Sequence, residues 1–449
     1  MIKAQPISWF YENLPELQII EDKFKDIIRK NYNLSGFVSL DTPAVERLEI
    51  LTSKWADDSE IYALHRIHAE NLSDVSMWLR FDLTVPLARY IGQYEWELTF
   101  PFKRQQIGRV YRWERPQKWR YREFYQADVD IIWNGKLALF ADVEILSTIY
   151  SSLKELDFWD FVIHVNNKKF LSWFLLSIWI LEDKLVETIS IIDKKEKIKW
   201  DKLQIMFTDI GINKEQIDKI NEFVDLWKQK TIDEITSDFS DINNELLQEW
   251  IKELSYVYKN LLLLWIDEKF LKINPAISRG LNYYTGTVFE TFIGWAEWMW
   301  SIASGWRYEN LASNFTKNNF PGVGGSIWLS RLLSVLAELD KIRPETKTVS
   351  QVLIVNMWDE FLTNNLQIVK NLRKMLISTE LYLDPEAKIQ KQLKYANNKG
   401  IPFIIIAWEE EINNWIIQIK NLKTWEQYEI KMEKLNYNII GVEISKEKR

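Results

Sequence analysis

The sequence predicts an α+β protein with a helical insertion and a separate α/β domain at its C-terminal end. Two segments, residues 79–132 and 276–309, are rich in aromatic and β-branched residues and are typical of sheet strands. Between them, residues 167–265 are rich in Lys, Glu, Ile and Leu at helical spacing, with almost no turn signals. Beyond residue 350, apolar strands alternate with helices, which indicates a small α/β domain with a mainly parallel sheet.

Length and composition favour a globular protein of two or three domains, since 449 residues exceed one ordinary core. Apolar residues make up 47% and charged residues 27%, and no apolar run approaches the roughly 18 residues of a membrane helix. The N-terminus lacks the basic start and apolar core of a signal peptide, so we expect a cytoplasmic protein without a membrane partner. The absence of cysteine excludes disulfides and thiolate metal sites. The formal charge of −7 does not by itself indicate nucleic acid.

The elements of the first 343 residues follow from periodicity and turn signals. An amphipathic helix is expected over residues 15–32, followed by an extended run that ends at Thr42-Pro43, because the residue before a proline is pushed out of helical geometry. A second helix is expected over residues 137–156. A third is expected over residues 329–339, after Gly324 and Gly325.

The C-terminal elements follow a polar linker over residues 344–350. They alternate between short apolar runs and longer amphipathic ones, as strands and helices do in α/β units. In order, the sequence predicts a strand from residue 352, a helix over 360–375, a strand over 378–383, a helix over 385–399 and a strand over 402–407.

A cluster of arginines interrupts the first strand-rich segment. Within and just before the loop ERPQKWRYRE stand Arg112, Glu114, Arg115, Arg120, Arg122 and Glu123. Such a charge run is compatible with a solvated hairpin loop or with a phosphate clamp, because guanidinium forks suit phosphate oxygens. On the next strand Gln126 and Asp130 share one face. An amide and a carboxylate on a buried face beside arginines are poorly explained as core, which favours a binding site.

Several motifs together resemble one known family. The segment YRWERPQKWRYREFYQADVDII resembles the second class-defining motif of class II aminoacyl-tRNA synthetases, in the form used by histidyl-tRNA synthetases. ISRGLNYYTGTVFE, residues 277–290, resembles the histidine family's own signature. RFDLTVPLARY resembles its amino-acid-binding strand, GFVSLDTPAVE the first class motif, SIASGWRYENL the second histidine-specific motif and GVGGSIWLSRLL the third class motif. DPEAKIQKQLKYANNKGIPFIIIAWEEE is similar to the anticodon-binding domain.

The resemblance runs from about residue 8 to 430 and implies a domain plan. It implies an antiparallel sheet of six or seven strands flanked by helices, and a homodimer paired through the first class motif. The expected domains are a catalytic first part over 1–165, a helical insertion over 166–265, a catalytic second part over 266–343 and an anticodon-binding domain over 350–449.

The resemblance also implies a reaction and a set of residue roles. L-histidine would be adenylated by ATP with Mg²⁺, which arrives with ATP rather than in a protein metal site, and then transferred to tRNA(His). The catalytic residues would be Arg279, Arg112 and Arg331, with Arg279 stabilising the charge that builds at the α-phosphate. Histidine would be bound by Asp82, Thr84, Gln126, Asp130, Tyr284 and Tyr308. ATP would be bound by Arg112, Glu114, Phe124 and Arg331, and tRNA by Arg115, Gln117, Lys388, Lys391, Lys394 and Lys399.

Two other functions compete with this one. The synthetase-like regulatory subunit that partners ATP phosphoribosyltransferase resembles the catalytic domain, but it lacks the anticodon-binding domain and usually loses catalytic residues. This chain keeps Arg112, Gln126, Arg279 and Arg331, together with a C-terminal domain. A prolyl or threonyl type of class II synthetase is disfavoured by ISRGLNYYTGTVFE.

Two single departures from the family pattern are Asn282 and Ser330, where acidic residues are usual. A third departure is systematic. The chain has 23 tryptophans and 14 glycines, whereas average glycine usage of about 7% would give roughly 30. Tryptophan stands where the family pattern has glycine at Trp9, Trp55, Trp119, Trp133, Trp298, Trp306, Trp328, Trp408 and Trp425.

These tryptophans bear on activity, because glycine marks positions of positive φ or of close approach to a ligand. An indole at residue 306 would enter the histidine pocket, and one at residue 328 would lie beside ATP. One interpretation is a Trp-rich and inactive relative. The other is that the gene uses UGA as a glycine codon, which was read here as tryptophan. The second interpretation accounts for the excess, the deficit and the positions together.

Overall fold

The computed structural model describes residues 2–431 except 54–57, 69–76, 116, 159, 193, 196–197, 227–230, 276, 278–283, 297–298, 345, 358–360 and 408–415. Of residues 168, 225–226 and 284–285 only the backbone is described. As far as it is described, the chain forms two compact units. The first holds Met1–Glu12 and Lys23–Ile342, and the second holds Asn13–Asp22 and Arg343–Arg449.

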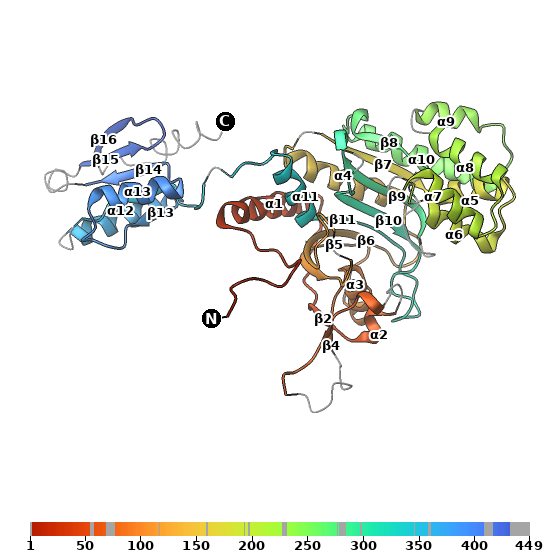
Figure 1. Cartoon of the computed structure of the whole chain (residues 1–449), viewed down its shortest axis with the longest axis horizontal. Coiled ribbons are helices and arrows are strands. Elements are labelled where there is room, and N and C mark those ends of the chain that lie inside the picture. Colours follow the sequence, from red (N-terminus) through yellow and green to blue (C-terminus); the bar gives the residue numbers. More distant parts are fainter. Residues whose placement is uncertain are drawn as a thin grey trace. The chain divides into compact units, whose positions relative to one another are not determined.

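A largely antiparallel sheet forms the centre of the first unit (Figure 1). In the described part it has eight strands in the order β1-β5-β6-β11-β10-β9-β7-β8. The central strands are β5 (Phe102–Tyr111), β6 (Glu123–Ile132), β11 (Gly322–Ile327), β10 (Ala303–Tyr308), β9 (Tyr284–Ile293) and β7 (Phe161–Asn167), and the edges are β1 (Val38–Ser39) and β8 (Leu271–Ile273). The resemblance implied six or seven strands, and the described sheet exceeds that number with two short edge strands that pair in parallel.

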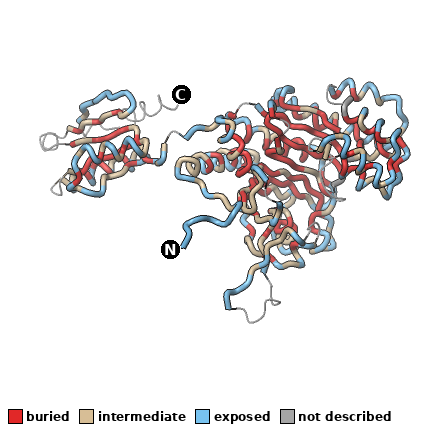
Figure 2. The backbone as a smooth tube through the Cα atoms, in the orientation of Figure 1, coloured by how far each residue is buried: buried red, intermediate tan, exposed pale blue. Residues whose placement is uncertain are grey.

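Helices cover this sheet and bury its strands (Figure 2). The helix α4 (Phe140–Glu155) packs on β6 and β11, and α11 (Leu329–Glu338) packs on β6. The helix α1 (Pro15–Leu34) reaches β6 through Tyr32, whose hydroxyl donates to the carbonyl of Ala127 at 2.9 Å. The predicted fold class of an antiparallel sheet flanked by helices is therefore confirmed.

The segment from residue 80 to 90 departs from the prediction of a strand. Thr84–Tyr94 forms the helix α3 instead, with Val85, Leu87, Ala88 and Ile91 buried at helical spacing. Pro86 lies in the first turn, where its missing N–H has no partner to lose. The apolar run preceding it, Met77–Leu79, is the strand β4, which pairs with β2 (Val45–Glu46) and β3 (Ala63–Leu64) in a small sheet. The short helix α2 covers Leu48–Leu51.

The insertion between β7 and β8 is helical, as predicted. Its helices are α5 (Lys168–Ser177), α6 (Glu182–Ile192), α7 (Trp200–Asp209), α8 (Lys214–Leu226), α9 (Ile232–Asp238) and α10 (Glu245–Leu263). Asn244 and Thr231 cap α10 and α9 through their side chains, which accept backbone N–H groups of the first turn. Among the described residues, no helix is both long enough and apolar enough to cross a membrane.

The second unit is an α/β domain whose sheet is only partly parallel. Its strands lie in the order β13 (Thr379–Leu381), β12 (Val352–Ile354), β14 (Phe403–Ile406), β15 (Ile416–Asn421) and β16 (Gln427–Lys431), and its helices are α12 (Leu362–Lys374) and α13 (Ile389–Lys399). The first three strands pair in parallel, as predicted, whereas β14, β15 and β16 pair antiparallel. The β15–β16 hairpin was missed because its alternating polar residues resemble a surface loop.

Tryptophan occupies backbone positions that side chains rarely adopt. Eight non-glycine residues of the described chain have positive φ, and five of them are Trp9, Trp119, Trp179, Trp265 and Trp425. A positive φ is an outlier for a bulky residue, because Cβ approaches the carbonyl oxygen. Packing does not explain these conformations, since Trp179 and Trp265 are 86% and 91% exposed.

The ends of three helices give a direct comparison. After α7, the N–H of Gly211 bonds the carbonyl of Thr208 and the N–H of Ile212 bonds that of Phe207, which is a Schellman motif with glycine at its left-handed position. The same pair of bonds closes α5 and α10, but with Trp179 and Trp265 in the place of Gly211. Leu376 and Asp340 show that other residues are accommodated there at the end of α12 and α11.

We expect Trp265→Gly to stabilise the first unit by about 1 kcal/mol. The conformational cost of about 1–2 kcal/mol for a side chain in the left-handed region exceeds the entropic cost of glycine. Thermal unfolding would show the change. Tyr256→Gly, an aromatic residue inside the same helix, is the matched control and should lower stability by about 1 kcal/mol. A loss of stability in both variants would contradict the argument.

The second unit should lose stability in acid through Glu380. This carboxylate accepts hydrogen bonds from Ser350 (2.6 Å), Tyr395 (2.9 Å) and Lys399 (2.7 Å). Burial opposes its ionisation, but these bonds lower the pKa of Glu380 from 4.5 to about 2. A carboxylate whose pKa is lower in the folded state than in the unfolded state stabilises the fold above its unfolded pKa. That stabilisation is lost as the pH falls, so the loss should run from about pH 4.5 to pH 2.

Glu380→Gln should remove that pH dependence and lower stability at neutral pH. Hydrogen exchange of β13 and α13 amides between pH 2 and pH 7 would measure both effects. Glu386→Gln, an exposed change in the same unit, is the control. Equal pH dependence in the two variants would refute the role of Glu380.

Candidate functional site

The site lies on one face of the central sheet and follows from strand register. Residues directly opposite in antiparallel strands share a face. In this register Arg104 of β5 stands opposite Asp130 of β6, which stands opposite Gly324 of β11 and then Trp306 of β10. One step along β6, Gln126 and Asp128 lie on the same face as Asp130. Gln126 and Asp130, two of the residues predicted to bind histidine, therefore share this face of the middle strands.

Asp130 is the centre of a buried polar cluster. Its carboxylate receives Arg104 Nη2 at 2.9 Å and the hydroxyl of Tyr308 at 3.2 Å. A Cβ on Gly324 would collide with this carboxylate, so the bare strand β11 is needed for the approach. Gln126 donates to Ser326 Oγ at 3.2 Å.

Buried polar atoms of this cluster lack protein partners. Among the described residues, Gln126 Oε1, Asp128 Oδ1, and Arg104 Nε and Nη1 are buried without a hydrogen bond. Leaving such atoms unpaired costs about 1–3 kcal/mol each, so native proteins seldom do so without reason. Several orphan donors and acceptors in one buried cluster indicate a site built for a polar ligand.

Burial raises the pKa of the carboxyl groups here. Desolvation is the largest influence on Asp82, Asp128 and Asp130, and the positive charge of Arg104 opposes it in all three. The pKa of Asp82 rises to about 6 and that of Asp128 to about 7. Groups with such shifts are poised to change charge when a cation enters.

Asp82 and Thr84 stand at the start of α3 rather than on the predicted strand. Asp82 Oδ1 accepts the N–H of Val85 at 3.0 Å and so caps the helix. The charges of Arg112 and Arg104 both act on Asp82, which places it beside the cluster. Two residues predicted from one motif are therefore held by a helix N-terminus.

The arginine cluster folds over the adjoining part of the sheet. Arg112 Nε donates to the carbonyl of Phe81 at 2.8 Å, and its Nη1 lies 3.6 Å from Glu114 Oε1. Glu114 also accepts from Arg120 Nε. Burial opposes ionisation of Glu114, but the bond from Arg120 and the charge of Arg112 hold its pKa below the usual value. Arg112, Glu114 and Arg120 thus form an ion-pair network at the base of a hairpin loop whose other residues are partly exposed.

Aromatic rings and Arg331 complete this end of the site. The rings of Phe124 and Trp328 stack with centroids 6.0 Å apart. The guanidinium of Arg331 lies 3.8 Å from the centre of the Trp328 ring, and its Nη1 donates to the carbonyl of Ser301 at 2.8 Å. The cavity left between these groups and Glu114 measures about 10 Å³, room for about one water molecule.

Some predicted residues lie outside the described part of the chain or are described only in part. Arg279 and Asn282 are outside the described residues, and Tyr284 is described by its backbone, which stands opposite Tyr308 in register. Ser330, the other departure, is buried: its hydroxyl contacts Tyr11 and accepts the N–H of Tyr125 at 2.8 Å. It therefore joins β6 to α11 where an acidic residue was expected.

The residues predicted to contact tRNA are mostly exposed. Arg115 and Gln117 are exposed in the loop between β5 and β6, and Lys388, Lys391 and Lys394 are exposed along α13 of the second unit. Lys391 pairs with Asp384 at 3.3 Å. Lys399 was grouped with these lysines, but it pairs with Glu380 at 2.7 Å, so its charge is neutralised within the unit.

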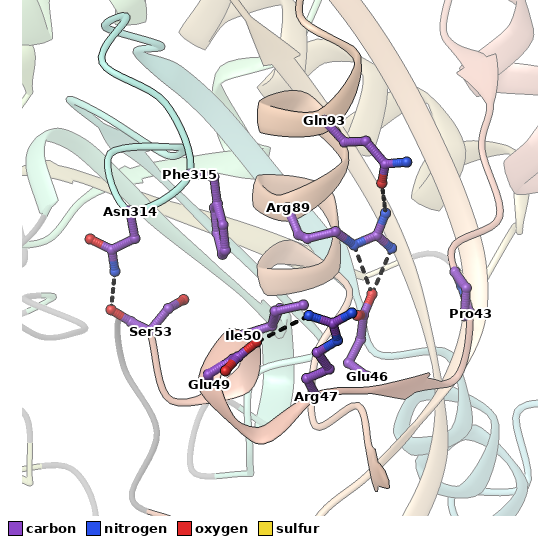
Figure 3. Close-up of a pocket in the computed structure, with 10 residues that line it drawn as sticks. All are labelled: Pro43, Glu46, Arg47, Glu49, Ile50, Ser53, Arg89, Gln93, Asn314 and Phe315. Atoms are coloured by element: carbon purple, nitrogen blue, oxygen red, sulfur yellow. Dashed lines mark hydrogen bonds and ion pairs between the residues drawn. The ribbon is translucent and has the colours of Figure 1, made fainter. Parts of the chain in front are cut away.

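A separate hollow of about 830 Å³ lies beside the first class motif (Figure 3). It is lined by Pro43, Glu46, Arg47, Glu49, Ile50, Ser53, Arg89, Gln93, Asn314 and Phe315. Its charged groups pair with one another: Arg89 with Glu46 at 2.6 Å and Arg47 with Glu49 at 3.3 Å. Because these ions are already satisfied, the hollow is a weaker candidate for chemistry than the cluster around Asp130.

Two members of the site were missed from the sequence. The sequence patterns assign no role to Arg104 or Asp128, although Asp128 lies between Gln126 and Asp130 on the same face of one strand. Arg104 sits in a strand of mixed polar residues, KRQQ, that gives no hint of burial. A signal was nevertheless present, since a polar strand central to a predicted sheet needs buried partners.

Comparison with known proteins agrees over nearly the whole chain. Residues 12–332 match the family profile described as Histidyl-tRNA synthetase, and residues 351–440 match that described as Anticodon binding domain. The histidine–tRNA ligase of Clostridium tetani is 39% identical over 96% of this chain and 97% of its own length, and that of Stenotrophomonas maltophilia is 37% identical over 97% of each.

Solved structures agree with the fold. The crystal structure of histidyl-tRNA synthetase from Nostoc sp. PCC 7120 superposes with a TM-score of 0.89 at 34% identity and covers 100% of both chains. An ATP phosphoribosyltransferase regulatory subunit/histidyl-tRNA synthetase from Bacillus halodurans C has a TM-score of 0.72 at 18% identity over 89% of this chain and 97% of its own, a likeness of fold alone. With both profiles present and relatives matched end to end, the chain belongs to the histidyl-tRNA synthetase family.

Proposed function

We propose that this protein is a histidine–tRNA ligase, which adenylates L-histidine with ATP and transfers the histidyl group to tRNA(His), releasing AMP and diphosphate. The observation that carries the proposal is the buried polar cluster around Asp130 with its orphan polar atoms, together with the ordered guanidinium groups of Arg112 and Arg331. A polar amino acid and a phosphate chain need such neighbouring surfaces. The regulatory-subunit alternative is not favoured, because the anticodon-binding match and the catalytic arginines are retained.

The polar cluster suits an imidazole side chain. Neutral imidazole has one donor and one acceptor nitrogen, and a carboxylate opposite a phenol can satisfy both. We assign these roles to Asp130 and Tyr284, while Tyr308, whose hydroxyl donates to Asp130 and which stands opposite Tyr284 in register, lines the same place. A substrate without a matching group would leave these buried atoms unpaired. Sites of this kind therefore reject such substrates by large factors.

The α-ammonium of the substrate fits the carboxyl group of Asp82 and the amide oxygen of Gln126. Asp82 caps α3 beside Arg112, and Gln126 Oε1 is a buried acceptor without a protein partner. A cation placed between them would compensate their desolvation. We therefore assign Asp82, Thr84 and Gln126 to the α-amino group.

The arginines would hold ATP and stabilise charge during transfer. When the substrate carboxylate attacks the α-phosphate, negative charge builds on phosphate oxygens, and fixed guanidinium groups stabilise it. Arg112 is preorganised for this by its bond to Phe81, and Arg331 by its bond to Ser301. By resemblance, Arg279 is assigned the same role of stabilising negative charge on the phosphate oxygens. Mg²⁺ would enter on the phosphates of ATP, as it commonly does.

The remaining assignments concern partners and place. Arg115 and Gln117 are proposed to face the acceptor end of tRNA, and Lys388, Lys391 and Lys394 the anticodon arm, since exposed cations contribute favourably to phosphate contacts. We also propose a cytoplasmic homodimer that pairs through the first class motif. The hollow beside that motif lies within the surface such pairing would use.

Histidine-dependent exchange of diphosphate into ATP tests the function. We expect exchange with histidine and none with proline or threonine, because neither of those side chains offers the separate donor and acceptor nitrogens of an imidazole. Exchange with another amino acid alone would overturn the assignment. Absence of exchange combined with tight binding to an ATP phosphoribosyltransferase would favour the regulatory alternative.

The printed chain raises a separate question at the adenine position. By resemblance Phe124 would stack on adenine, but the indole of Trp328 already stacks on Phe124 and lies against the guanidinium of Arg331. The remaining 10 Å³ cannot admit a base. Trp306 stands in the row of Asp130 and Gly324, with its side chain on the substrate face. We infer that Trp328 fills the adenine position and that Trp306 narrows the histidine position.

We propose that the working enzyme carries glycine at residues 119, 306 and 328, as UGA read as glycine would supply. The backbone supports this, because Trp119 has φ of 62° and four further tryptophans share the left-handed region. Reading the codons tests it, since UGG at these three positions would refute the proposal. The intact mass of the protein from its native host is an independent check.

Trp328→Gly should open the adenine position. We expect the full-length variant to bind ATP at least tenfold more tightly than the printed chain, because the indole no longer occupies the stacking place on Phe124. Titration calorimetry with ATP measures the change. Trp96→Gly is the matched control, since Trp96 is 83% exposed at a turn outside the site. Equal ATP affinity in all three proteins would show that the indole does not block the base.

A further inference from the structure

Arg104 is an arginine that none of the assigned roles uses. It lies on β5 with its side chain wholly buried, and Nη2 donates to the carbonyl of Leu83 at 3.2 Å. The same nitrogen lies 2.9 Å from Asp130 Oδ2 and 4.0 Å from Asp128 Oδ2. A buried arginine is costly unless it is paired. Here it is paired with the carboxylate assigned to the imidazole.

The surroundings of Arg104 are dominated by acidic and phenolic groups. Asp82, Asp128 and Asp130 face it as carboxyl groups, and Tyr32 and Tyr308 face it as phenols. Among the described residues, Arg112 also acts on Asp82, and Arg80 on Asp128. Arg104 is the cation in direct contact with Asp130 among the described residues. Its loss would leave that carboxylate with one hydroxyl donor.

Geometry also restricts where Asp130 points. Arg104 Nη2 binds Oδ2 while the Tyr308 hydroxyl binds Oδ1. On the next strand, Gly324 leaves room for the carboxylate where any Cβ would displace it. The carboxylate is thus held at both oxygens and faces Gly324, a position of β11 without a side chain.

We propose that Arg104 is a positioning residue that keeps Asp130 ionised and oriented toward the imidazole of the substrate, and so contributes to selection of histidine. This inference rests on the proposed function, which places the imidazole opposite Asp130. Arg104 touches no reacting atom. Its effect reaches the substrate through Asp130, and it should therefore appear as a change in histidine affinity and in its pH dependence.

The sign of the pH effect follows from the carboxylate. Without Arg104, desolvation is less opposed and the pKa of Asp130 rises further. A protonated Asp130 can no longer accept a hydrogen bond in the same way from the imidazole N–H. Raising the pH deprotonates it again. The loss of affinity in an Arg104 variant should therefore be largest at low pH and shrink as pH rises.

The test is titration calorimetry of full-length chains with histidine from pH 6 to pH 8.5, beside thermal unfolding. We expect Arg104→Met to weaken binding at least tenfold near pH 7, with a smaller loss at pH 8.5. Arg104→Lys, which keeps the charge, should recover most of the affinity. Arg109→Met is the matched control on the same strand, since Arg109 pairs with Glu123 at 2.8 Å outside the cluster. It should bind histidine like the parent.

A double-mutant comparison separates positioning from a merely structural role. In an Asp130→Asn background, Arg104→Met should add little further loss, because the group it positions is gone. An equal loss in both backgrounds, or parent-like binding at every pH, would overturn the proposal. Should Arg104→Met fail to fold, Arg104→Lys decides by the same pH series and background. If the parent, with either tryptophan or glycine at residues 306 and 328, shows no histidine binding, the proposed function itself fails.

Discussion

The antiparallel register of β5, β6 and β11 is the constraint on which the site depends. It sets Arg104, Asp130 and Gly324 in one row, so a cation, an anion and an empty position lie side by side across three strands. Because the side-chain period of a strand is two, a slip of one residue would turn this whole set to the other face. The covering helices α4 and α11 stabilise this register by burying the sheet.

The same register explains why glycine matters so much here. Strands β10 and β11 carry Gly305, Gly322, Gly324 and Gly325, and a Cβ on any of them would meet a neighbouring side chain or backbone atom. Bare backbone in these strands is what leaves room for Asp130 and Tyr308. Trp306 stands in the same row and Trp328 directly follows β11, where they replace empty space by indole. The two indoles fill space that the site needs, but this conflict is confined to the site and leaves the surrounding fold intact.

Much of the fold could be predicted because its signals are local. The helices α1, α4 and α11 follow from apolar spacing, and the parallel strands of the second unit from short apolar runs between helices. The errors have physical causes. The aromatic and β-branched composition around α3 favours a strand, whereas the spacing of its buried apolar residues is that of a helix. The edge strands β1 and β8 are defined by pairing with their neighbours, which no local pattern reveals.

For the site, sequence patterns identify the chemical groups that are present: the arginine loop, the alternation of Gln126 and Asp130, and the excess of tryptophan over glycine. Folding alone reveals that Arg104 binds Asp130, that Asp82 caps α3, and that five tryptophans hold a left-handed backbone. The difference lies in how far apart in the sequence the interacting residues are. Periodicity and motif spacing are properties of neighbouring residues, whereas an ion pair across strands, a desolvated carboxyl group and a stacked indole depend on residues that only folding brings together.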